Sequence, residues 1–69
     1  MSRHIFVITV TGELDQRLCD EFEDVGISVA RGVTRFELVS PDPSALHGVL
    51  HRVELLGLEL LEVSAADET

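Results

Sequence analysis

This chain of 69 residues carries a formal net charge of −8, so long-range repulsion excludes nucleic acid and an anionic membrane surface as expected partners. Its residues are 45% hydrophobic, too many for a disordered chain, yet each apolar run is shorter than the ~20 residues of a membrane span. A domain this small buries only ~60% of its unfolded surface, and a lone cysteine gives it no internal disulfide, so we expect it to associate with another chain.

The first predicted elements are a strand from His4 to Thr11 and a helix from Leu14 to Asp24. Apolar residues alternate along the first segment, and Gly12 ends it. In the second segment Leu14, Leu18, Phe22 and Val25 recur at the spacing of one helix face. Gly26 follows the last of them, where it is expected to act as a left-handed helix cap.

A short hairpin is expected next. Ile27 to Arg31 and Val33 to Val39 are rich in β-branched residues, and the turn between them lies at Arg31-Gly32. Within it, Phe36 and Leu38 are expected to face the helices. The Pro41-Asp42-Pro43-Ser44 segment then breaks the strand, and one of its polar residues is expected to cap the next helix.

The second helix is predicted from Ser44 to Leu56, ending at Gly57, and the last strand from Leu58 to Val63. Residues 64–69 are small, acidic and aperiodic, so we expect residues 1–63 to form one domain and 64–69 a flexible acidic tail. This order predicts an α+β, ferredoxin-like βαββαβ fold: a four-stranded antiparallel sheet with two helices on one face.

The pattern of Gly12, Leu14, Leu18, Phe22, Gly26 and Ile27 resembles that of ACT domains, with Thr9-Val10-Thr11 in place of the usual Asp-x-Pro. The segments 45–50 and 56–63 also resemble a set of short stand-alone bacterial proteins. The ACT resemblance implies a regulatory module that pairs edge to edge or face to face. It also implies that a small molecule, often an amino acid, binds at the interface near the first strand-to-helix loop.

By position, that ligand-binding loop consists of Thr11, Gly12, Glu13 and Leu14. The free N–H groups and the dipole at a helix N-terminus favour a carboxylate, and Glu13 could take the amine of the ligand. The alternative is structural: Gly12 only makes the turn, and Glu13 only complements the helix dipole.

A candidate metal site consists of His47, His51 and Glu54, which the helical period places on one flank of the second helix. Two imidazoles four residues apart can chelate a transition metal, and Glu54 could be a third ligand. The alternative is a pair of half-exposed histidines without a metal, and no cofactor is expected. His4 could join them only through a tertiary or intersubunit contact.

Neither Cys19 nor the predicted core favours catalysis. Cys19 is followed by the acidic Asp20 and Glu21 and lies beside the apolar stripe, which indicates a packing role in a reducing, cytoplasmic compartment. The helix-facing residues are expected to fill the core and to leave little room for a substrate. They are Phe6, Ile8, Val10, Leu18, Phe22, Phe36, Leu38, Leu46, Val49 and Leu50.

The opposite face of the sheet is predicted to be apolar with a few charges. Its expected members are Ile5, Val7, Ala30, Val33, Val39, Leu61 and Val63, with Arg35, Glu37 and Glu59. Such a patch is large for a small monomer, so we expect a second copy or a larger protein to cover it. The sequence therefore predicts a non-catalytic, self-associating regulatory or adaptor module. The alternatives are an interaction subunit without a small ligand, a small dimeric enzyme, and a histidine-based metal protein.

Overall fold

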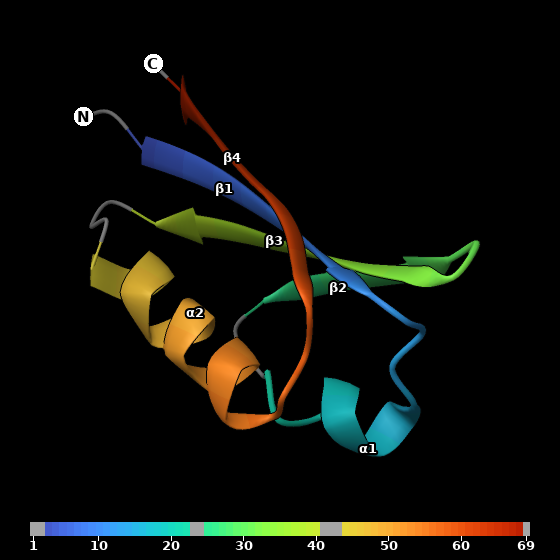
Figure 1. The fold of residues 1–69 in the computed structure, drawn as a ribbon. Coiled ribbons are helices and arrows are strands. Elements are labelled where there is room, and N and C mark those ends of the chain that lie inside the picture. Colours follow the sequence, from blue (N-terminus) through green and yellow to red (C-terminus); the bar gives the residue numbers. More distant parts are fainter. Residues whose placement is uncertain (1–2, 23–24, 41–43, 69) are drawn as a thin grey trace.

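The computed structural model describes residues 3–22, 25–40 and 44–68. Its elements are β1 (Arg3–Thr11), α1 (Gln16–Cys19), β2 (Gly26–Ala30), β3 (Val33–Ser40), α2 (Ser44–Leu55) and β4 (Leu60–Glu68). The strands form one antiparallel sheet in the order β2-β3-β1-β4, and both helices lie on the same side of it (Figure 1). This arrangement confirms the predicted ferredoxin-like fold. Neither helix is long enough to cross a membrane, in the part of the chain that the structure describes.

The core lies between the sheet and the helices. Alternate residues of β1 and β3 point into it, which confirms the predicted inward positions, and Val49 and Val53 of α2 close it from below. Phe22 packs on Phe36 with ring centroids 4.7 Å apart, a contact that typically adds ~0.5–1.5 kcal/mol to the gain from burial. The buried apolar set is Phe6, Ile8, Val10, Phe22, Phe36, Leu38, Val49 and Val53. Leu18, Leu46 and Leu50, which were expected in the core, are only half-buried.

The first helix is much shorter than predicted. It spans four residues, Gln16–Cys19, and the carboxylate of Asp15 caps it by accepting from the amide of Leu18 at 3.0 Å. Beyond it the backbone closes tight turns: the amide of Phe22 donates to the carbonyl of Cys19 at 3.1 Å. These turns still bring Phe22 beneath the sheet, which confirms its predicted place in the core, although the predicted helix is wrong. The predicted end at Asp24 lies outside the described residues.

The β2–β3 hairpin is confirmed. Its turn residues, Arg31 and Gly32, have φ values of 55° and 81°, as a type I′ turn requires. The predicted cap at Gly26 is wrong, because this residue does not have a positive φ and begins β2 instead. The helix cap expected within the 41–44 segment falls mostly on residues 41–43, which lie outside the described part of the chain.

Gly57 terminates helix α2, as predicted, and the last helical residue is Leu55 instead of the expected Leu56. Gly57 has a φ of 73°, its amide donates to the carbonyl of Glu54 at 3.0 Å, and the amide of Leu58 donates to that of Val53 at 3.1 Å. These two bonds are those of a Schellman motif, which satisfies carbonyls at the end of the helix.

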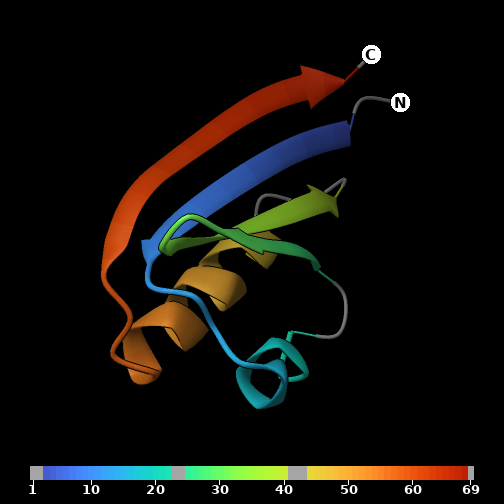
Figure 2. The ribbon, with the colours of Figure 1, turned by 90° about the vertical axis from the view of Figure 1, so that its right-hand side faces the viewer.

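The last strand begins later and continues further than predicted. β4 runs from Leu60 to Glu68 beside β1, so the expected flexible tail is wrong for residues 64–68. Its register with β1 is regular from Glu68 back to Glu62, and an irregularity near Leu61 follows. Figure 2 shows the two strands curving together over the helices. Pairing with the backbone of β1 extends the strand where the side chains give no apolar pattern.

Candidate functional site

The loop between β1 and α1 is hydrogen-bonded to the turn of the β2–β3 hairpin. The amide of Gly12 donates to the carbonyl of Gly32 at 2.7 Å, and the amide of Gly32 donates to the carboxylate of Glu13 at 2.8 Å. Thr11, at the start of the loop, bonds instead to Glu59, through its backbone amide at 2.9 Å and its hydroxyl at 3.2 Å. The loop therefore links the end of β1 to the hairpin turn and to the segment between α2 and β4.

Thr34 fixes the inner side of this loop. Its side chain is fully buried, with 0% exposure, and it is the only buried polar residue in the described ranges. Its hydroxyl donates to the carbonyl of Gly12 at 2.8 Å and accepts from the amide of Leu14 at 3.0 Å. One side chain of β3 thus satisfies two backbone groups of the β1–α1 loop.

These contacts occupy several of the groups that would bind a ligand at the predicted site of Thr11, Gly12, Glu13 and Leu14. The structure brings the four residues together, but the amides of Gly12 and Leu14 and the carboxylate of Glu13 have partners within the chain. The four-residue α1 is also too short to provide the strong dipole that the prediction used. Ligand binding at this loop stays a prediction. Gly12 makes the turn with a φ of 95°, as the structural alternative expects, whereas Glu13 bonds to the hairpin turn instead of complementing a helix dipole.

The predicted metal ligands lie on α2 with exposed side chains. His47, His51 and Glu54 do not gather into a site: within residues 3–22, 25–40 and 44–68 no group of three or more His, Cys, Asp or Glu side chains is placed to hold a metal ion. His4 stacks on Phe6 in β1, with ring centroids 5.9 Å apart. The chain by itself therefore does not form the predicted three-ligand site.

The sheet face opposite the helices is the open face, and it carries most of the predicted interface. The pairing register puts Ile5 directly opposite Val39, and Val7 and Val33 on the same side of the sheet. Val39 is 45% exposed, and the other three are half-buried by their strand neighbours. Arg35 and Glu37 of β3 are exposed on the same face.

The placement of Val63 on the open face is wrong. It lies opposite Ile8, a buried core residue, and so it faces the helix side, where it is 38% exposed. Leu61 is 53% exposed and falls at the irregularity in the register, where strict alternation of faces does not hold. Ser64, opposite Val7, takes the place on the open face that the sequence reading gave to Val63.

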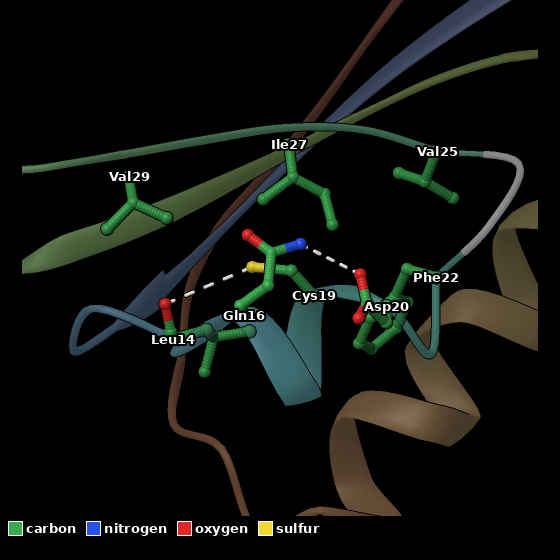
Figure 3. Close-up of a pocket in the computed structure, with 8 residues that line it drawn as sticks. All are labelled: Leu14, Gln16, Cys19, Asp20, Phe22, Val25, Ile27 and Val29. Carbon is green, nitrogen blue, oxygen red and sulfur yellow. Dashed lines mark hydrogen bonds between the residues drawn. The ribbon is translucent and has the colours of Figure 1, made fainter.

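Sequence reasoning missed a groove of about 730 Å³ between α1 and β2. Ile27 and Val29 point from β2 toward α1, and Gln16 and Cys19 point back from α1 (Figure 3). The groove is lined by Leu14, Gln16, Cys19, Asp20, Phe22, Val25, Ile27 and Val29. The available signal was the alternation of Val25, Ile27 and Val29, which places three apolar side chains on one face of a strand with a short helix beneath it.

Cys19 is one of the residues that line this groove. Its thiol is half-buried and approaches the carbonyl of Leu14 at 3.9 Å, while the side-chain amide of Gln16 donates to the carboxylate of Asp20 at 2.8 Å. The expectation that Cys19 lies beside the apolar stripe is therefore confirmed.

The comparisons with known proteins identify the family of the chain. No curated protein and no solved structure matches it. A family described as a domain of unknown function (DUF8691) matches residues 5–64, which run from the start of β1 into β4 and include the loop, the open face and the groove. The chain belongs to this family, DUF8691.

Proposed function

We propose that this chain is a non-catalytic module that associates with a second copy through the open face of its sheet. The observation that carries the proposal is the apolar character of that face on the two central strands. In an antiparallel sheet with one solvated face, outward positions are usually polar. Here Ile5, Val7 and Val39 occupy neighbouring outward positions on β1 and β3.

The charges on this face fit a twofold interface. Arg35 and Glu37 are successive outward residues of β3, opposite in sign. In a twofold arrangement the same patch meets itself, so an arginine of one copy can approach a carboxylate of the other. This local balance matters because two whole chains of net charge −8 repel each other.

The test is the mass of the assembly by sedimentation. Val39→Lys puts a charge into the apolar patch, beside Ile5, and we expect it to halve the mass while the circular dichroism spectrum stays the same. Leu55→Lys is the matched control, because Leu55 is 72% exposed on α2, on the other side of the sheet. A mass that Val39→Lys leaves unchanged refutes the proposal. A wild type with the chain mass of 7.6 kDa favours an adaptor for another protein instead.

A second proposal is that the module responds to a small amino-acid-like molecule, as the ACT resemblance implies. The groove beside Leu14 supports it, because its volume lies in the ~300–1,000 Å³ range of small-molecule sites and its lining combines polar groups, the carboxylate of Asp20 among them, with apolar side chains. A ligand raises the unfolding midpoint by linkage. A midpoint shift that Asp20→Asn reduces and Glu54→Gln preserves supports this proposal; a flat response to the common amino acids removes it. The lone cysteine favours a cytoplasmic setting for either role.

A further inference from the structure

β2 is an edge strand that lacks the usual protection against pairing with another chain. Among the described residues it pairs only with β3, in a regular register. Its sequence, Gly26-Ile27-Ser28-Val29-Ala30, contains no charged residue and no proline. Edge strands of soluble proteins normally carry charges, prolines or bulges that prevent such pairing.

The other edge, β4, has this protection. Glu62 lies within it, and its register with β1 is irregular near Leu61. Two β4 edges of an acidic chain repel each other, and a β4 edge fits poorly against a regular strand. β2 itself carries no charge, so the side chains of two β2 strands do not repel each other as those of two β4 strands do.

The geometry of the hairpin shows which backbone groups β2 presents to a partner. In a hairpin with a two-residue turn, the residues that flank the turn exchange both of their hydrogen bonds. Here these residues are Ala30 and Val33, so Ser28 also bonds toward β3. The N–H and C=O groups of Ile27 and Val29 consequently point away from β3, toward the free edge.

The side chains of the same two residues point to the helix side, over the groove that Figure 3 shows. Val29 is 38% exposed and Ile27 is half-buried. On the opposite side of the strand, the side chains of Ser28 and Ala30 are small. An added strand thus finds apolar contacts on the groove side and no steric obstacle on the other.

We propose that β2 pairs antiparallel with β2 of a second copy about a twofold axis at Ser28. This register puts Ile27 opposite the partner's Val29 and Val29 opposite the partner's Ile27, so that every outward N–H and C=O of these residues gains a partner. The exposed apolar side chains then pack in pairs over the joined grooves. The acidic β4 edges lie at the two ends of the combined sheet, which stops further growth.

Cysteine cross-linking tests the register. In a Cys19→Ser background, which removes the native thiol, Ser28→Cys puts two thiols at a directly opposed pair, where Cβ atoms lie about 4.5–5.5 Å apart. We expect a disulfide-linked dimer after mild oxidation. Ala30→Cys is the matched control, because Ala30 lies opposite the partner's Gly26 and far from the partner's Ala30. Cross-linking that is absent at position 28, or equal at both positions, overturns the proposal.

Sedimentation separates this edge from the open face. Val29→Pro removes an outward N–H at an edge position where proline is tolerated, and Val29→Thr keeps that N–H in a β-branched residue. We expect Val29→Pro to halve the mass and Val29→Thr to preserve it, and the double variant with Val39→Lys to reach the chain mass of 7.6 kDa. If Val29→Pro loses the fold, Val29→Glu tests the same edge by charge. A folded Val29→Pro or Val29→Glu variant of unchanged mass refutes edge pairing, whatever Val39→Lys does.

Discussion

Replacing Thr34 by valine tests whether its hydroxyl holds the β1–α1 loop in place. Valine has nearly the same shape, so the substitution removes the two hydrogen bonds, to the carbonyl of Gly12 and from the amide of Leu14, and leaves the packing. Each part-buried group that loses its partner costs about 1 kcal/mol at the lower end of the usual range, so the loss of unfolding free energy is about 2 kcal/mol. For a domain of this size, that lowers the unfolding midpoint by about 8–16 °C.

Thr34→Ser is the control, since it keeps the hydroxyl and removes one methyl group, which costs about 1 kcal/mol. Thermal unfolding followed by circular dichroism gives the order of stability, and hydrogen exchange of the amide of Leu14 gives the cause. We expect this amide to exchange faster in Thr34→Val than in Thr34→Ser. If Thr34→Val is as stable as the wild type and this amide keeps its protection, the role assigned to the hydroxyl is wrong.

Three further variants test other parts of the structure. Gly57→Ala should lower the unfolding free energy by about 1–2 kcal/mol, because φ is 73° at this position. Gly48→Ala should raise it by about 0.5–1 kcal/mol, because Gly48 lies inside α2 with open space around an added Cβ. Chemical denaturation measures both changes, and changes of the same sign would contradict the α2 terminus described above. Deleting residues 64–69 should lower the unfolding midpoint clearly, because most of these residues pair with β1, and an unchanged midpoint would restore the predicted tail. Adding zinc should leave the unfolding midpoint of the wild type and that of His47→Ala each unchanged, since the described part of the chain forms no three-ligand group. A zinc-induced shift that His47→Ala abolishes would show a metal site shared between copies.

The predictions that succeeded rest on local chemistry. The Arg31-Gly32 turn follows from the few residues that accept a positive φ, and Gly57 ends α2 for the same reason. The inward positions of β1 and β3 follow from strict alternation of apolar side chains. These features depend on neighbours in the sequence, which a sequence displays directly.

The predictions that failed depend on contacts between distant segments. Leu14, where the helix was predicted to begin, lies before α1, and its amide bonds to Thr34 of β3; nothing near Leu14 in the sequence indicates this contact. Residues 64–68 form a strand because β1 is beside them, although their composition is that of a tail. The shift near Leu61 then moves Val63 to the other face of the sheet, which a count of alternate residues cannot detect.

The pairing of β1 with β4 also has a consequence for folding. The first and last strands of the chain lie side by side, so one edge of β1 receives its partner only when the most distant segments meet. Pairings between distant segments form slowly, because the entropy of closing the intervening chain is lost before any contact is gained. Until β4 arrives, β1 presents a bare strand with alternating Phe, Ile and Val side chains, to which β4 of another molecule can attach as well as its own. Refolding at high concentration should therefore produce molecules that have exchanged β4, and dilution during refolding should suppress them.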